Sequence, residues 1–171
     1  MDTRSATSHD LDDPAKRLAR LAREKRLTVV AAESCTGGLL AQILCDAPGA
    51  TDFFHGSFVT YTKLQKIRAF GVPADLLQSK GAVCAEVARA MATGALQRSP
   101  ADLSAAITGV AGPEPDEDGN PVGRVWIAVA GRGGEAQDLV HDYGDIGRDA
   151  VRRRAVADTL AALMKVAAEI E

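Results

Sequence analysis

The sequence is short of cysteine, of long apolar runs and of excess charge. Its three cysteines, Cys35, Cys45 and Cys84, are an odd set without CxxC spacing, which is typical of reduced thiols in a cytoplasm rather than of disulfides or zinc sites. No apolar run approaches the roughly 20 residues of a membrane-spanning helix, and the polar, acidic segment 1–16 has no apolar signal-peptide core. The composition therefore predicts a cytoplasmic protein that makes no use of a membrane.

Charge and motif content exclude further classes. Lysine and arginine total 20 against 23 aspartate and glutamate, a net charge of −3, so we expect no general attraction to nucleic acid or to a membrane surface. The three histidines, His9, His55 and His141, are scattered, and no HExxH, Walker A or GxGxxG pattern occurs. We therefore expect no metal ion, no cofactor and no nucleic-acid partner.

The 171 residues, 46% of them hydrophobic and 25% charged, suffice for one domain with a substantial core. Residues 1–13 are expected to form a flexible leader. Pro14 is a good first residue of a helix, so the single domain is expected to span 14–171. Strands are expected at 27–32, 53–61, 103–107, 122–130 and 136–141, with helices from Pro14, from the Ser34 turn to Cys45, and at 63–70, 74–78, 83–98 and 148–169. Thr62 is expected to cap the helix at 63–70.

This alternation of strands and helices is typical of an α/β protein, a three-layer α/β/α sandwich on a mixed, mostly parallel sheet. The strand at 27–32 is almost entirely apolar and the one at 103–107 also has the pattern of a buried strand, so we expect both to be internal and parallel. The glycines within 131–134 predict a hairpin, with 136–141 antiparallel to the strand before it. Gly56 and Ser57 indicate a bulge or a close ligand approach in the second strand.

A turn rich in hydroxyls and glycine follows the first strand and precedes a helix. It reads Ser34-Cys35-Thr36-Gly37-Gly38. The first N–H groups of a helix lack partners, so this junction suits a ligand, or a serine nucleophile beside an oxyanion hole. Alternatively, Ser34 or Thr36 simply caps the helix, which is the interpretation that these residues alone favour. Thr108 and Gly109 end the other parallel strand, and such strands end at one edge of a sheet, so the two turns are expected to meet.

Six motifs follow one another in a recognisable order. They are Glu33-Ser34-Cys35-Thr36-Gly37-Gly38; Phe54 with Val59-Thr60-Tyr61-Thr62 and Lys66; Gly81-Ala82-Val83; Thr108-Gly109-Val110-Ala111-Gly112-Pro113; Pro121-Val122-Gly123; and Gly147-Arg148 with Arg152. Over about residues 14–166 the chain thereby resembles the CinA C-terminal domain family of nicotinamide mononucleotide deamidases. The resemblance implies hydrolysis of nicotinamide mononucleotide to nicotinate mononucleotide and ammonia through a Ser/Lys dyad and an acyl-enzyme. It also implies no metal and commonly a homodimer.

The resemblance further assigns roles to residues. Ser34 would be the nucleophile and Lys66 the general base, with Tyr61 as a supporting hydroxyl. N–H groups of the turn 36–38 would hold the oxyanion. The substrate site would include Glu33, Thr36, Gly37, Gly38, Thr108, Gly109 and Gly112. Arg148 and Arg152, four residues apart on the last helix, would suit the substrate phosphate, with a solvated helix face as the alternative.

A lysine serves as a base only when it is neutral, and its free pKa is about 10.4. Burial or a neighbouring positive charge lowers that pKa. Lys63, three residues before Lys66, would contribute such a charge if it is close. The alternative for both lysines is a solvated helix surface. Lys63, Ser57 and the segment 114–120 are also the places where the chain departs from the family pattern, which bears on substrate preference more than on the dyad.

A competing function uses the same turns without catalysis, as a nucleotide- or phosphate-binding regulatory module. Both functions need the glycine turns, but only the enzyme needs Ser34 together with a lysine of lowered pKa. We interpret Cys35 as a small packing residue and His55 as a structural histidine, and a core aromatic is the alternative role for Tyr61.

Overall fold

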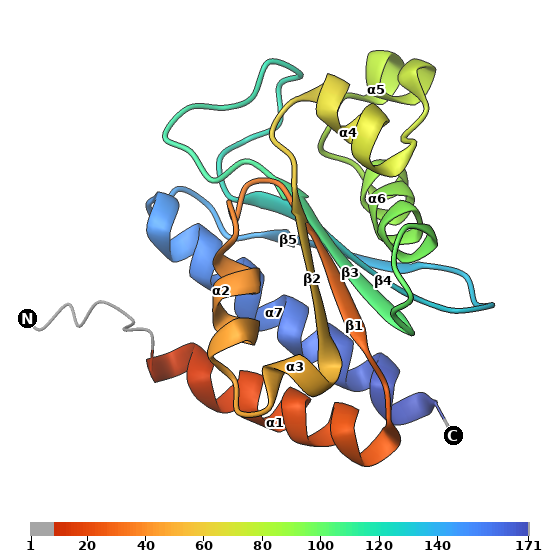
Figure 1. Cartoon of the computed structure of the whole chain (residues 1–171). Coiled ribbons are helices and arrows are strands. Elements are labelled where there is room, and N and C mark those ends of the chain that lie inside the picture. The colour runs from red at the N-terminus through yellow and green to blue at the C-terminus, as the bar shows by residue number, and fades with distance from the viewer. Residues whose placement is uncertain (1–8, 171) are drawn as a thin grey trace, which may run out of the picture.

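In the computed structural model, which describes residues 9–170, strands and helices alternate along the chain (Figure 1). The described residues form five strands: β1 (Val29–Glu33), β2 (Phe54–Val59), β3 (Leu103–Gly109), β4 (Arg124–Gly131) and β5 (Gln137–Asp142). They also form seven helices: α1 (His9–Lys25), α2 (Leu39–Asp46), α3 (Ala50–Phe53), α4 (Lys63–Phe70), α5 (Ala74–Lys80), α6 (Ala85–Gln97) and α7 (Arg148–Glu169). No helix in residues 9–170 is long and apolar enough to cross a membrane.

The strands form one mixed sheet in the order β2-β1-β3-β4-β5. β1 is parallel to both of its neighbours, β2 and β3, whereas β4 is antiparallel to β3 and to β5. All five residues of β1 are buried, because helices cover both faces of the sheet there. The prediction of two internal, parallel strands and a late antiparallel hairpin is confirmed.

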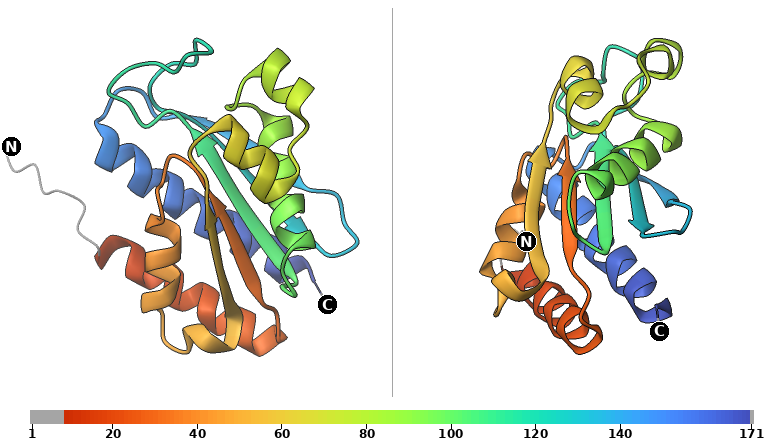
Figure 2. Two further views of the ribbon diagram at one scale, coloured as in Figure 1. Left: turned by 45° about the horizontal axis from the view of Figure 1, so that its top comes forward. Right: turned by 45° about the vertical axis from the view of Figure 1, so that its right-hand side comes forward.

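Alternate residues of β1 face two separate cores, one on each side of the sheet. Val29 and Ala31 pack with apolar residues of α1, α2 and α7, whereas Val30 and Ala32 pack with those of α4, α5 and α6. Figure 2 shows the same separation, with helices on both sides of the twisted sheet. The predicted three-layer sandwich is therefore confirmed.

The start of α1 differs from the expectation. The helix begins at His9, before the start expected at Pro14, which lies inside it. Pro14 has no N–H to donate to the carbonyl four residues earlier, but Leu11 and Ala15 are buried in the core that α1 shares with α7. The burial of Leu11 extends the ordered domain into the segment 1–13 that the sequence assigned to the leader. Residues 1–8 lie outside the described residues, so a flexible leader there stays a prediction.

β2 is shorter than the strand expected at 53–61. Phe53 instead ends the short helix α3 and is buried, and the strand stops at Val59. The register of β1 against β2 shifts at His55, which is the extra residue of a β-bulge. The following Gly56 has a φ of 132°, which favours glycine. The bulge predicted in this strand is confirmed.

Candidate active site

The carboxyl ends of β1 and β3 meet at one edge of the sheet. Glu33 and Ile107 are paired residues of the two parallel strands. The N–H of Ser34 then donates to the carbonyl oxygen of Ile107 at 3.0 Å. The two turns that follow these strands, at Ser34 and at Thr108, therefore lie on the same edge, as predicted.

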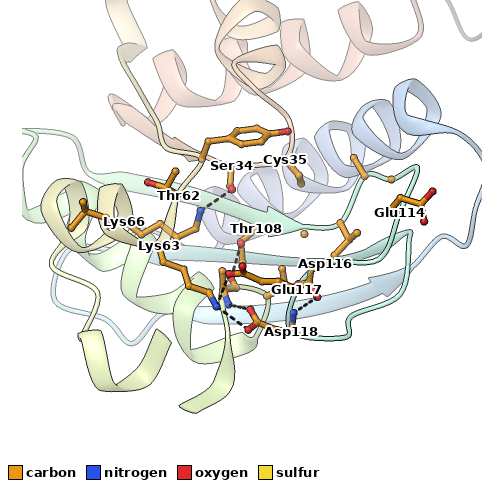
Figure 3. A pocket seen from close by; sticks show the side chains of 18 residues that line it. Ser34, Cys35, Thr62, Lys63, Lys66, Thr108, Glu114, Asp116, Glu117 and Asp118 are labelled. Carbon is orange, nitrogen blue, oxygen red and sulfur yellow. Dashed lines mark hydrogen bonds and ion pairs between the residues drawn. The ribbon is translucent and has the colours of Figure 1, made fainter. Parts of the chain in front are cut away.

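A cavity of about 650 Å³ opens at this edge, within the range of sites for small ligands. Ser34, Tyr61 and Lys66 line one side of it. The end of β3 and its connection to β4 line the other side, through Thr108–Gly112, Glu114 and the acidic residues Asp116, Glu117 and Asp118. Figure 3 shows Ser34 and Lys66 pointing toward one another across the top of this cavity.

Ser34 and Lys66 form a buried hydrogen-bonded pair. Lys66 Nζ donates to Ser34 Oγ at 2.8 Å. The lysine is 1% exposed and the serine 7%. Burial disfavours the charged ammonium and lowers the pKa of Lys66 to about 8, against a smaller opposing effect of the Cys35 thiol. A lysine with this pKa is partly neutral near physiological pH, so it can accept a proton from the serine.

Helix α4 presents Lys66 to the interior. Its cap is Thr62, whose Oγ1 accepts from the N–H of Gln65 at 3.1 Å, as the sequence predicted. Lys66 and Phe70 lie four residues apart and are the buried residues of this helix. Phe70 belongs to the core beneath α4 and packs edge-on against Phe58 of β2. The apolar anchor of α4 therefore fixes the direction from which the lysine reaches Ser34.

Lys63 does not help to keep Lys66 neutral, contrary to the expectation. Its Nζ lies 2.8 Å from Asp118 Oδ1 and 2.9 Å from Glu117 Oε1 (Figure 3). Hydrogen bonds to these two carboxylates raise the pKa of Lys63 and offset its charge. The lowered pKa of Lys66 arises from burial instead.

Glu33 and the turn that follows it build the site without lining the cavity. Glu33 is fully buried, and its carboxylate accepts from the Thr36 hydroxyl at 2.8 Å and from the Gly38 N–H at 3.0 Å. The Gly37 N–H donates to the carbonyl oxygen of Ser34 at 3.0 Å. Glu33, Thr36, Gly37 and Gly38 do not line the cavity, and the contact with substrate expected of them stays a prediction.

The hydrogen bonds within the turn leave a different set of N–H groups for an oxyanion than the expected set, 36–38. The N–H groups of Gly37 and Gly38 are already occupied. Within residues 9–170, the N–H groups of Cys35 and Thr36 are the two of this turn that have no oxygen acceptor. An oxyanion formed at Ser34 is therefore expected to accept from this pair rather than from the glycines.

The other predicted site residues, Tyr61, Thr108, Gly109 and Gly112, do line the cavity. Tyr61 is at the rim and 63% exposed, so the alternative of a core aromatic is wrong. The Thr108 hydroxyl donates to the carbonyl oxygen of Ala82 at 2.8 Å, so it joins β3 to the connection between α5 and α6. A Cβ at Gly109 would lie 2.7 Å from the backbone oxygen of Arg124, so the close approach of β4 requires glycine.

The two arginines of α7 lie outside the cavity lining. Arg152 Nε donates to the carbonyl oxygen of Cys35 at 2.7 Å, so α7 braces the Ser34 turn. Arg148 is exposed, four residues before it at the start of the helix. Only Arg152 contacts the turn, and the phosphate contact expected of the pair stays a prediction.

The remaining reactive side chains offer no competing site. Burial raises the pKa of the Cys35 thiol to about 12, so it stays protonated, in agreement with its interpretation as a packing residue. All three cysteines are free. His55 and His141 do not line the cavity. In residues 9–170, no group of three or more histidine, cysteine, aspartate and glutamate side chains could hold a metal ion.

Sequence reasoning missed the acidic wall of the cavity. The sequence marks the segment 114–120 only as a departure from the family pattern and does not place Asp116, Glu117 and Asp118 at the site, although their loop directly follows the Thr108 turn. Its position along the chain was a usable signal, because a segment that leaves the carboxyl edge of a parallel strand borders the site there.

Fold and site together define a three-layer α/β protein with a buried serine–lysine pair at the carboxyl edge of its parallel strands. The profile of the CinA C-terminal domain matches residues 11–167. The chain therefore belongs to the CinA C-terminal domain family.

Individual relatives agree with this assignment. A CinA-like protein of Geobacter sulfurreducens is 48% identical over 135 residues, which cover 79% of this chain and 32% of that protein. The competence/damage inducible protein CihA from Agrobacterium tumefaciens has a solved structure with 38% identity and a TM-score of 0.88, covering 92% of this chain and 95% of that one. The solved structure of a CinA superfamily protein from Escherichia coli has 36% sequence identity and a TM-score of 0.88. The match covers 96% of this chain and 94% of that one. The chain spans about a third of the length of the curated relative and nearly all of the solved chains.

Proposed function

We propose that this protein is an amidohydrolase that converts nicotinamide mononucleotide into nicotinate mononucleotide and ammonia. The observation that carries the proposal is the buried hydrogen bond of 2.8 Å between Lys66 Nζ and Ser34 Oγ, together with the Lys66 pKa of about 8. A serine attacks an amide only when a base takes its proton, and this lysine meets that need. The substrate follows from the resemblance of the sequence motifs, and the cavity of about 650 Å³ has room for it.

The chemistry takes place in two halves. Neutral Lys66 takes the proton of Ser34 while Oγ forms a bond to the carboxamide carbon, and the N–H groups of Cys35 and Thr36 stabilise the oxyanion. Lys66 then gives the proton to the amine, the C–N bond breaks, and ammonia leaves an acyl-enzyme ester. Water attacks this ester, Lys66 transfers the proton of the water to Ser34 Oγ, and nicotinate mononucleotide is released.

The same proposal assigns the outer parts of the substrate. Tyr61, at the rim of the cavity, supports the departing amine with its hydroxyl. The phosphate is assigned to Arg152 and Arg148 at the start of α7, because arginine suits phosphate through paired N–H donors. Lys63 does line the cavity, but Glu117 and Asp118 already bind its ammonium group.

The competing proposal is that the protein is a nucleotide- or phosphate-binding regulatory module without catalysis. Under either proposal we expect the protein to be in the cytoplasm. Such a module gains nothing from a lysine buried against a serine, because burying the ammonium reduces stability. This consideration favours the enzyme.

The experiment is to incubate the purified protein with nicotinamide mononucleotide and to quantify ammonia and nicotinate mononucleotide. The wild type is expected to form both in equal amounts and Ser34→Ala to form neither. Ser79→Ala, which alters an exposed serine on α5, is the matched control and should keep full turnover. Calorimetric binding of the nucleotide by the wild type without ammonia release would favour the binding module.

A further inference from the structure

Glu33 has an unusual environment for a carboxylate. It is fully buried, and no lysine or arginine of the described residues forms an ion pair with it. Its Oε2 accepts from the Thr36 hydroxyl at 2.8 Å, the Gly38 N–H at 3.0 Å and the Leu40 N–H at 3.1 Å. Its Oε1 accepts from the Ala41 N–H at 2.9 Å and the Ser57 hydroxyl at 3.0 Å. Five donors and the positive end of the α2 dipole thus replace a cation.

These hydrogen bonds fix the backbone next to the nucleophile. Glu33 immediately precedes Ser34 in the chain, and its side chain binds the backbone that follows the turn. The N–H of Ser34 is bound by Ile107, and its carbonyl oxygen accepts from Gly37. The Ser34 backbone is therefore fixed at both its N–H and its carbonyl, and the Glu33 carboxylate fixes the residues that follow it.

We propose that Glu33 is a positioning residue for the Ser34–Lys66 pair, an inference that rests on the proposed hydrolysis. The carboxylate holds the turn so that Ser34 Oγ stays 2.8 Å from Lys66 Nζ. It also occupies the free N–H groups at the start of α2, so this helix end is closed to a substrate anion. The substrate phosphate must then be bound elsewhere. Ser57 acts together with Glu33, because its hydroxyl is the donor to the carboxylate that comes from β2.

Glu33→Gln tests this role, because the amide keeps the shape but turns an NH2 group toward donors. We expect kcat to fall by about 10-fold to about 100-fold, since a small misplacement of reacting groups has that effect. KM and the pH midpoint of activity should stay near those of the wild type, because substrate contacts and the burial of Lys66 are unchanged. Ser57→Ala removes one of the five donors and should give a smaller loss of kcat.

The matched control is Asp102→Asn. Asp102 accepts from the N–H and the hydroxyl of Thr28 at 2.8 and 2.7 Å, at the other end of β1, far along the sheet from Ser34. Asp102→Asn disturbs a comparable set of hydrogen bonds to a carboxylate, so this substitution should lower the melting temperature but leave kcat unchanged. An equal kcat loss in both variants would show a general loss of stability and would overturn the positioning role.

A second readout does not depend on the substrate. A fluorophosphonate forms a bond from Ser34 Oγ to phosphorus with loss of fluoride while the serine proton passes to Lys66, and intact mass spectrometry follows the adduct. Slower labelling of Glu33→Gln than of Asp102→Asn supports the positioning role even if nicotinamide mononucleotide is not hydrolysed. Wild-type labelling rates in folded Glu33→Gln, or an unreactive Ser34 in the wild type, would overturn it.

Discussion

Lys66 is the residue at which function and stability conflict. Its side chain is 1% exposed, and its Nζ has the Ser34 hydroxyl as partner instead of a carboxylate. Burying an ammonium without an opposite charge is unfavourable, and the lowered pKa reports that effect. The same burial therefore governs both the pH dependence of activity and the stability of the fold.

Activity is expected to rise with pH to a plateau, with a midpoint near the Lys66 pKa of about 8. Below this pH the lysine carries a proton and cannot act as base. Steady-state kcat/KM for nicotinamide mononucleotide, measured from about pH 6 to about pH 10, checks this. A midpoint near the free histidine value of about 6.5 would point to a different base.

Lys66→Met is expected to stabilise the protein at pH 7 while abolishing turnover. The pKa of Lys66 falls from 10.5 in the unfolded chain to about 8 in the folded one. Below pH 8 both states bind the proton, so the folded state bears the full burial penalty, which is relieved as the pH rises from about 8 to 10.5. We expect a gain of roughly 1–3 kcal/mol in the free energy of unfolding at pH 7.

Urea unfolding of the wild type and Lys66→Met, at about pH 7 and about pH 9.5, measures this difference. The advantage of the variant should shrink at the higher pH, because the wild-type lysine is then neutral in the folded state. A variant less stable than the wild type at both values would show that the lysine is not a source of instability.

Helix α4 shows what the sequence does and does not reveal about an element. Its bounds, 63–70, and the cap at Thr62 were predicted, because both depend on neighbouring residues. The partners of Lys63 were not, since Glu117 and Asp118 lie more than 50 residues away in a segment without periodic pattern. Glu33 was assigned to substrate for a similar reason: a carboxylate after a buried strand has the same local pattern whether it meets a ligand or helix N–H groups.

The bridge from Lys63 to Glu117 and Asp118 is expected to hold the loop that forms the acidic wall of the cavity. Lys63→Met should raise KM by about twofold to fivefold with kcat unchanged, because partly exposed pairs contribute up to about 1 kcal/mol. The amides of 114–120 should also exchange hydrogen faster.

The control is Lys80→Met, which breaks the ion pair with Glu86 outside the cavity and should change neither KM nor this exchange. An unchanged exchange rate in Lys63→Met would show that the bridge does not hold the loop.

At the scale of the molecule, the topology explains where the site lies. The helices after β1 cover one face of the sheet, and those after β2 cover the other, so the chain leaves the two neighbouring strands in opposite directions (Figure 1). The crevice at such a point is where open α/β sheets bind ligands. This much was predictable from the alternation of strands and helices, whereas the acidic wall depends on the path of one irregular loop.

The assembly expected for this family is a homodimer, which we propose for this chain as well. Light scattering coupled to size exclusion should give a mass near 36 kDa, twice the 17.9 kDa of the chain. Dilution over the range of the activity assay should leave that mass unchanged. A mass near that of one chain at all concentrations would contradict the dimer without touching the proposed chemistry.

Ammonia release from nicotinamide mononucleotide by Lys66→Ala and Lys66→Arg, measured beside the wild type, tests the central claim most directly. Both variants should lose about 10²-fold to about 10⁴-fold of kcat, since alanine has no base and guanidinium stays protonated. Lys165→Ala, at an exposed lysine of α7, should keep wild-type turnover, and circular dichroism should show all variants folded. Near-normal turnover in folded Lys66→Ala would contradict the account and would move the search for the base to Lys63.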